Sequence, residues 1–176
     1  MNTTPVGDVQ VPRRSPFHFP NPVNEWAARS VAFGVFSLSV LALVTGWYWL
    51  TAVLFAGFLL RLGWGPRYSP LGRLAVHVIA PRLGAPRLVP GPPKRFAQGI
   101  GTVVTGLATV LWFTTGSAVG PAVLLGILVL AAGLEAFLGF CLGCWIFARL
   151  MAWGVIPASV CEACANVSAR YAQNPA

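Results

Sequence analysis

A length of 176 residues would fit one globular domain, but 56% of the residues are hydrophobic, only 9% are charged, and the mean hydropathy is +0.71. This composition excludes an ordinary soluble core and predicts an integral membrane protein. The formal net charge is +8. Because the aromatic residues lie in apolar runs and not between Lys and Arg, membrane topology explains this charge better than nucleic-acid binding does. The first thirty residues hold no apolar stretch of the kind a cleavable signal peptide needs.

The amino-terminal part of the chain divides into an arm and a hairpin. Residues 1–25 are polar and rich in proline, so we expect a disordered or extended arm. Residues 26–62 follow as a predicted transmembrane helical hairpin. Its first apolar segment ends near Thr45, and Gly46 begins a turn with three aromatic residues of the interfacial kind. Its second segment, closed by Arg61, has about 15 residues and is short for a span, which takes about 20.

Residues 63–97 form a basic, proline-rich loop that is too polar to span a membrane. Between Pro70 and Pro81, apolar residues recur at helical spacing opposite Arg73 and His77, which predicts a short amphipathic helix on the membrane surface. The apolar positions are Leu71, Leu74, Ala75 and Val78. His77 has no companion at metal-ligand spacing, and we assign it to the polar side of this helix.

The cations of this region are denser than topology alone requires. Seven of the twelve Lys and Arg residues lie within residues 61–97, and each cation near an anionic surface contributes about 1 kcal/mol. We expect the loop to bind anionic lipid headgroups or to dock an acidic cytosolic protein, with the ordinary cytoplasmic bias of positive charge as the alternative. The residues expected to do so are Arg82, Arg87, Lys94 and Arg95.

Residues 98–153 are predicted to form a second transmembrane hairpin. Its first span ends near Thr114, and its second begins near Pro121, so about 20 residues bring the chain to Cys141 at the membrane boundary. The same helix is expected to continue into the interface as far as Trp153. The turns of both hairpins lack Lys and Arg, and the positive-inside rule therefore places both termini and the central loop in the cytoplasm.

All four cysteines fall in two Cys-x-x-Cys pairs, Cys141 with Cys144 and Cys161 with Cys164, separated by sixteen residues. On a helix, positions i and i+3 share a face, so each pair can direct both sulfurs the same way. Gly and Pro residues between the pairs predict that one helix ends and a short carboxy-terminal cytoplasmic helix begins within residues 154–176. A tight antiparallel turn there would bring the four sulfurs to one height.

Three interpretations of these cysteines stay open. On the cytoplasmic side, paired cysteines are more often metal ligands or redox-active thiols than structural disulfides. The first interpretation is a redox or sulfur-relay dithiol at Cys141 and Cys144, with Cys161 and Cys164 resolving or relaying. The second is a structural zinc site made by all four, since their spacing fits a four-cysteine site. The third is four buried, inert thiols.

Glu135 is the one acidic residue inside a predicted span, and a membrane-embedded carboxyl group is a functional candidate. It lies six residues before Cys141, which on one continuous helix is too far round to share the face of that thiol. We therefore do not assign it as the base for Cys141. A protonated or Arg-paired carboxyl group between helices is the expected alternative.

Three stretches have specific sequences: residues 65–74 (GPRYSPLGRL), 92–101 (PPKRFAQGIG) and 140–144 (FCLGC). They resemble the bacterial membrane family of domain of unknown function 4395, and the resemblance covers about residues 23–168. Tyr68 stands where Phe is the common form. Members of that family are often encoded near thioredoxin-like and thiosulfate sulfurtransferase genes, so the resemblance implies a sulfur or redox setting in the bacterial cytoplasmic membrane. The family has no defined catalytic residues to carry over.

These observations predict an all-α membrane protein, a four-helix bundle of two hairpins with a basic loop and a short carboxy-terminal helix. Its expected function is a thiol-based redox or sulfur-relay module that works with thioredoxin-like or sulfurtransferase proteins of the cytosol. A non-enzymatic scaffold or docking protein with structural zinc is the alternative. Quinone-linked disulfide-forming enzymes also carry two cysteine pairs in a membrane bundle, but they oxidise on the outer side, whereas charge places these cysteines inside.

Overall fold

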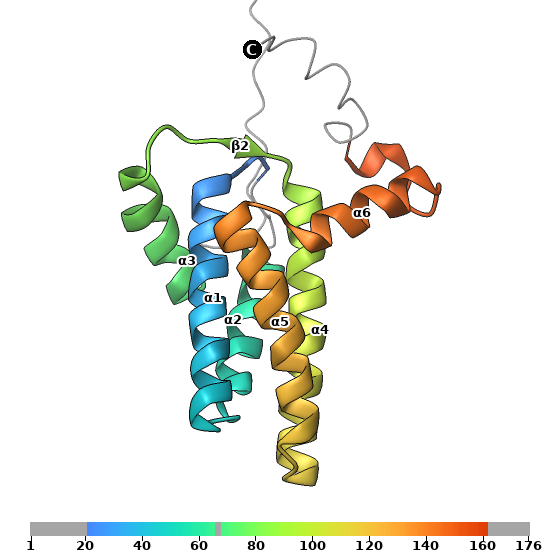
Figure 1. Cartoon of the computed structure of the whole chain (residues 1–176). Helices are drawn as coiled ribbons and strands as arrows, with labels where there is room; N and C mark the ends of the chain where they lie inside the picture. Colours follow the sequence, from blue (N-terminus) through green and yellow to red (C-terminus); the bar gives the residue numbers. More distant parts are fainter. Residues whose placement is uncertain (1–20, 66–67, 162–176) are drawn as a thin grey trace, which may run out of the picture.

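The computed structural model describes residues 21–65 and 68–161, and this part of the chain is almost wholly helical (Figure 1). The helices are α1 (Glu25–Thr45), α2 (Leu50–Trp64), α3 (Pro70–Leu74), α4 (Gly91–Thr115), α5 (Val119–Leu138) and α6 (Leu142–Ala152). Two short strands, β1 (Val23–Asn24) and β2 (Leu88–Val89), pair antiparallel, with Val23 opposite Val89. The predicted all-α class is confirmed. The expected disorder of the amino-terminal arm falls mostly on residues 1–20, outside the described residues.

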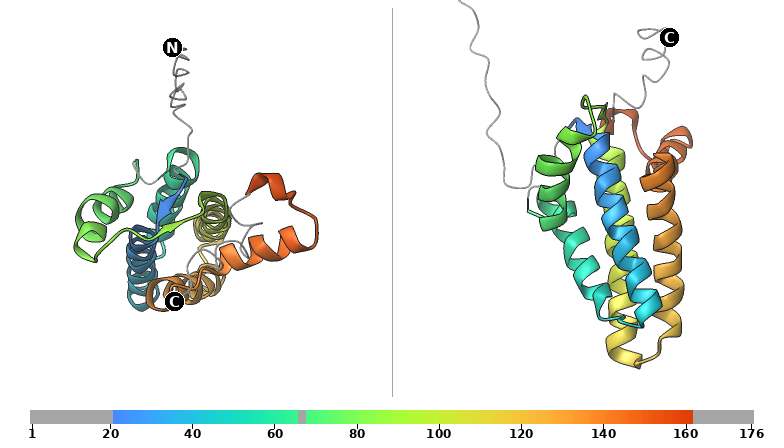
Figure 2. Two further views of the ribbon diagram at one scale, coloured as in Figure 1. Left: turned by 90° about the horizontal axis from the view of Figure 1, so that it is seen from above. Right: turned by 60° about the vertical axis from the view of Figure 1, so that its left-hand side comes forward.

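Four of these helices, α1, α2, α4 and α5, lie side by side and are called the core helices below (Figures 1 and 2). The closest packing joins α1 to α5, α2 to α4 and α4 to α5. By length and composition, α1, α4 and α5 are able to cross a membrane, whereas α2, with 15 residues, is shorter. Most of the buried side chains between them are apolar, with Ser39, Thr51 and Thr105 among the polar ones, and a Cβ atom at Gly101 of α4 would lie 2.2 Å from the Phe58 ring of α2. Small residues permit this close approach, as is usual between membrane helices.

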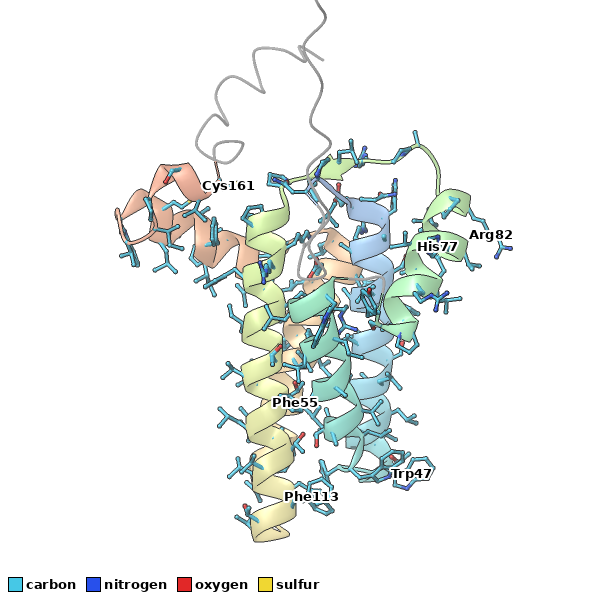
Figure 3. The ribbon with its side chains drawn as sticks, turned by 180° about the vertical axis from the view of Figure 1, so that it is seen from behind. Trp47, Phe55, His77, Arg82, Phe113 and Cys161 are labelled. Atoms are coloured by element: carbon cyan, nitrogen blue, oxygen red, sulfur yellow. The ribbon has the colours of Figure 1, made fainter. Side chains whose placement is uncertain are left out.

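One end of the core helices is aromatic and uncharged. It contains the α1–α2 turn and the α4–α5 turn, and neither turn holds a charged residue. Trp47 and Phe113 lie at this end (Figure 3), and the Tyr48 and Trp112 rings are 5.2 Å apart. At the opposite end are the β1–β2 pair, the start of α4 and the start of α6 (Figure 1).

The short amphipathic helix predicted between Pro70 and Pro81 is present. Part of its buried face and its orientation relative to the core helices differ from the prediction. The helical turns continue from α3 through a π-helical turn (Ala75–Ile79) to a 3₁₀ turn (Ala80–Arg82). This run lies beside the upper half of α1 and does not cross the helix ends (Figures 1 and 2). A Cβ atom at Gly34, in the middle of α1, would lie 2.6 Å from Leu71.

The apolar face predicted for this run is confirmed at Leu71 and Ala75 and is wrong at Leu74 and Val78. The buried residues are Gly72, Ala75 and Ala80, whereas Leu74 and Val78, both expected on the apolar face, are 48% and 37% exposed. The π-helical turn accounts for Val78, because its wider turn rotates the residues within it away from the 3.6-residue period, whereas Leu74 precedes this turn. His77 is exposed, as predicted for the polar side of this helix.

The helix expected to run from Pro121 to Trp153 is two helices. α5 ends at Leu138, and α6 leaves sideways from the core helices (Figures 1 and 2). Cys141 therefore lies between two helices and not within one.

Candidate functional site

The chain turns sharply just before the first cysteine pair. Gly139 ends α5 in the left-handed region, with φ of +70°, where a side chain would strain the backbone. The Arg29 guanidinium, from α1, donates hydrogen bonds to the carbonyl oxygens of Ala136, at 3.1 and 3.2 Å, and of Phe137, at 2.9 Å. A cation at a helix carboxy-terminus is favourable, because the last carbonyls of the helix carry partial negative charge. Arg29 thus fixes the point at which the cysteine pair begins.

Cys141 is the N-cap residue of α6. Its backbone is extended, and its Sγ accepts a hydrogen bond from the Cys144 backbone N–H at 3.3 Å. The Cys144 Sγ lies 2.6 Å from the Cys141 Sγ and donates its hydrogen to it. Both cysteines are free thiols. A disulfide bond is roughly 2.05 Å long, so the two sulfurs are not bonded. The difference is small, and little movement would bring them to bonding distance.

The two thiols of this pair have opposite electrostatic settings. The hydrogen bond from the Cys144 thiol, together with the positive charge of Lys94, lowers the pKa of Cys141 in spite of its burial. The same hydrogen bond, which must break for Cys144 to ionise, raises the pKa of Cys144 far above its usual range, and burial adds to the effect. Cys141 is therefore the thiol that ionises more readily, and Cys144 is the one that keeps its proton.

A largely buried ion pair, with side chains 11% and 18% exposed, stands next to this dithiol. The Lys94 ammonium, in the first turns of α4, lies 2.5 Å from the Glu135 carboxylate of α5. Glu135 is thus paired with a lysine and not with an arginine. Lys94, expected on the docking surface of the loop, is buried and has no place there. The other three docking candidates, Arg82, Arg87 and Arg95, are exposed.

The glycine between the cysteines allows α6 to rest on α4. A Cβ atom at Gly143 would lie 2.6 Å from the Cβ and 2.7 Å from the Cα of Ala97. One turn further, Phe147 of α6 meets Phe96 of α4, with ring centres 5.6 Å apart. Two of the three specific stretches, residues 92–101 and 140–144, therefore meet at this site. Lys94 and Ala97 belong to the first of them. That both stretches have specific sequences was the signal that could have linked Lys94 and Ala97 to the cysteines.

A cavity of about 120 Å³ reaches Cys141 from inside the core helices. Its walls are mainly apolar side chains of α1, α4, α5 and α6, and its polar groups are Gln98, Glu135 and Cys141. Only 9% of Cys141 is exposed. The site is thus accessible to small reactants and closed to most of a folded protein.

The second cysteine pair is described only in part. Cys161 is buried and disulfide-bonded, and it lies at the same end of the molecule as the start of α4 (Figure 3). Cys164 lies outside the described residues. Within residues 21–65 and 68–161, no three His, Cys, Asp or Glu side chains gather in a way that would hold a metal ion. The four-cysteine zinc hypothesis therefore stays a prediction.

Comparisons with known proteins find one relationship. The family model described as domain of unknown function (DUF4395) matches residues 23–152. This range includes the ion pair, the first cysteine pair and the whole of α6. No curated protein and no solved structure matches the chain.

Proposed function

Because the chain belongs to the DUF4395 family, whose function is not defined, we propose from its geometry that Cys141 and Cys144 form a dithiol that exchanges electrons or sulfur at a membrane boundary. One observation carries the proposal: the two free thiols touch at the start of a helix, where one is favoured as thiolate and the other holds its proton. A helix start favours a negative charge, and a low thiol pKa favours attack near neutral pH.

In the proposed exchange, the Cys141 thiolate attacks one sulfur of a disulfide R–S–S–R. A mixed disulfide forms, and one RS⁻ leaves and takes the proton of the Cys144 thiol. The Cys144 thiolate then attacks the Cys141 sulfur, so the Cys141–Cys144 disulfide forms and the second RS⁻ leaves. The dithiol loses two electrons and the reactant gains them. With a persulfide as donor, Cys141 takes the outer sulfur and the donor leaves as a thiol.

Low exposure of Cys141 sets the size of the reactant. It favours a small disulfide or persulfide over a disulfide buried in a folded partner. The thioredoxin-like and sulfurtransferase proteins expected from the family resemblance would act as donors or acceptors through a disulfide or persulfide sulfur that is exposed on their own surface. Their proposed docking surface is the exposed cations Arg82, Arg87 and Arg95.

The proposed setting is a bacterial cytoplasmic membrane crossed four times. α1, α4 and α5 are apolar and long enough to cross it, and α2 would be the fourth span. The turns at the aromatic end are uncharged and would lie outside, with the cysteines and both termini on the cytoplasmic side. The alternative function is a scaffold or docking protein whose four cysteines bind structural zinc.

Trapping the mixed disulfide tests the proposed function. With Cys161 and Cys164 replaced by serine throughout, Cys144→Ser should accumulate one glutathione on Cys141 when glutathione disulfide is added, because the resolving thiol is absent. Cys141→Ser should accumulate less, because burial still raises the pKa of the remaining Cys144 thiol after the Cys141 sulfur is gone. Equal trapping by the two variants, or none in either, would reject the dithiol proposal, and stoichiometric zinc with thiols blocked until chelation would select the scaffold.

A further inference from the structure

Arg61 is a buried cation outside the cysteine site. It lies in the last turn of α2 and is only 4% exposed. Its Nε donates to Gln98 Oε1 at 2.9 Å, one terminal nitrogen donates to Ser69 Oγ at 3.0 Å, and its guanidinium lies over the Phe58 ring, 4.7 Å from the centre. These partners are all neutral. Among the described residues, Glu135 pairs with Lys94, and no carboxylate pairs with Arg61.

The position of this cation along the helix makes its charge costly. Arg61 lies eleven positions along the helix from Leu50, at the aromatic end, which is about 16 Å of helix. The hydrocarbon part of a bilayer is about 30 Å thick. A charged side chain at this depth is normally paired or lines a polar cavity, because an unpaired charge is unfavourable in hydrocarbon.

The backbone also breaks at this level. α2 ends at Trp64, and the next helical turns start at Pro70 and continue beside α1. The Ser69 side chain is buried, caps the start of α3 and accepts the hydrogen bond from Arg61. Irregular backbone at membrane depth occurs where protein covers it or where it lines a cavity. Arg61 and Ser69 thus hold the two parts of a broken segment together.

A crevice of about 580 Å³ leads to this pair. Its walls are apolar side chains of α1 and α2 together with Pro70 and Leu71, and Arg61 and Ser69 are its polar members. Val53, also in its wall, is 48% exposed, so the crevice lies on the outer face of α2. Apolar walls with one guanidinium at the end fit an amphiphile better than a soluble ion.

We propose that Arg61 and Ser69 bind the phosphate of an anionic membrane lipid whose hydrocarbon chain fills this crevice. The guanidinium supplies the charge that no described carboxylate balances, and charge-assisted hydrogen bonds to phosphate are among the stronger polar contacts. The apolar walls would contact the hydrocarbon chain of the lipid, whereas a free phosphate ion would leave the crevice empty. The proposal does not rest on the dithiol, although Gln98, which accepts a hydrogen bond from Arg61, also lines the cavity beside Cys141.

Native mass spectrometry of the purified full chain in detergent, titrated with phosphatidylglycerol, tests the site. The wild type should retain one lipid, and Arg61→Gln should bind it at least about tenfold more weakly, because the charge-assisted bonds are lost. Arg73→Gln removes an exposed cation of the neighbouring α3 and should bind as the wild type does. Equal lipid binding by Arg61→Gln and wild type would overturn the proposal.

A second variant and a second ligand keep the test decisive if Arg61→Gln unfolds. Ala56→Leu narrows the crevice but keeps both polar groups, and it should weaken lipid binding without altering alkylation of Cys141. Inorganic phosphate at millimolar concentration should leave the bound lipid in place. Displacement of the lipid by phosphate, or full lipid binding by Ala56→Leu, would show that the crevice does not hold the chain and would overturn the lipid assignment.

Discussion

Cys141 and Cys144 are chemically identical side chains whose reactivities are separated by position. Cys141 precedes the helix, so its sulfur can receive both the Cys144 N–H and the Cys144 thiol hydrogen. Cys144 is already within the helix, where it gives hydrogen bonds and receives none from its partner. The direction of reactivity is therefore built into the order of the two residues along the chain.

Removing the thiol hydrogen of Cys144 should raise the pKa of Cys141, because that hydrogen bond is the largest cause of its lowered value. A lowered pKa means that the thiolate persists to lower pH, so the variant needs a higher pH for the same reactivity. In a chain with Cys161 and Cys164 replaced by serine, Cys144→Ala should therefore shift the alkylation profile of Cys141 to higher pH. Cys144→Ser keeps an O–H donor and should shift it less. A profile that does not move in Cys144→Ala would contradict the assigned hydrogen bond.

Breaking the buried ion pair should cost stability as well as reactivity. Lys94→Gln leaves the Glu135 carboxylate buried without a cation, and loss of one partner of a buried pair typically destabilises by about 3–5 kcal/mol. The double variant Lys94→Gln with Glu135→Gln should recover much of that loss, since no charge stays buried. Thermal unfolding in detergent, followed by tryptophan fluorescence, measures both. A single variant as stable as the double would show that the pair is not a buried charge pair in solution.

At the scale of the elements, the breaks between helices place the site. Gly139 stops α5, Arg29 holds its end, and Gly143 lets α6 rest on α4. The cavity beside Cys141 exists because α6 leaves the core helices at this point and does not continue α5 (Figure 2). A continuous helix would carry the cysteines past the ion pair.

A methyl group at Gly143 should push α6 away from α4. Its Cβ would lie 2.6 Å from the Cβ of Ala97, and overpacking of this kind costs about 1–3 kcal/mol. Gly143→Ala should lower the melting temperature and slow closure of the Cys141–Cys144 disulfide by an added oxidant. Gly126→Ala is the matched control, because nothing lies within 4 Å of a Cβ atom at that helical glycine. If the two variants behave alike, the contact between Gly143 and Ala97 does not position the dithiol.

The sequence predicted what depends on local pattern and missed what depends on packing. Apolar length predicted α1, α5 and the part of α4 after residue 97, and the i, i+3 spacing predicted that Cys141 and Cys144 direct their sulfurs the same way, although Cys141 precedes the helix. The break at Gly139 was missed because a glycine inside an apolar run also suits close helix packing. That single error then removed Glu135 from the site, since its distance from Cys141 was judged on a continuous helix. The pairing of Glu135 with Lys94 joins residues 41 apart and has no local signal.

At the scale of the whole molecule, charge divides the protein into two ends. Between Arg29 and Arg61, and again between Arg95 and Glu135, the chain has no charged residue. These two stretches form the aromatic end and the greater part of the core helices. The start of α6, with the dithiol, lies towards the opposite end (Figure 1), and so does the exposed cation Arg82 (Figure 3).

Site-directed labelling tests the proposed membrane orientation. In a chain whose native cysteines are replaced by serine, Trp47→Cys should react with an impermeant maleimide added to intact cells, because its turn is uncharged and predicted to lie outside. Arg82→Cys should react only after lysis. Labelling of Arg82→Cys in intact cells would reverse the orientation and place the dithiol on the outer side.

The central claim is that Cys141 and Cys144 act as a reversible dithiol. Its most direct measurement is a redox titration of the full chain in native membranes, with each state trapped by alkylation and the bridge located by mass spectrometry of peptides. The account predicts a disulfide between Cys141 and Cys144 that forms and breaks over a defined range of potential, also when Cys161 and Cys164 are serine. Thiols that stay reduced across the titration, or that react only after a chelator removes bound metal, would contradict it.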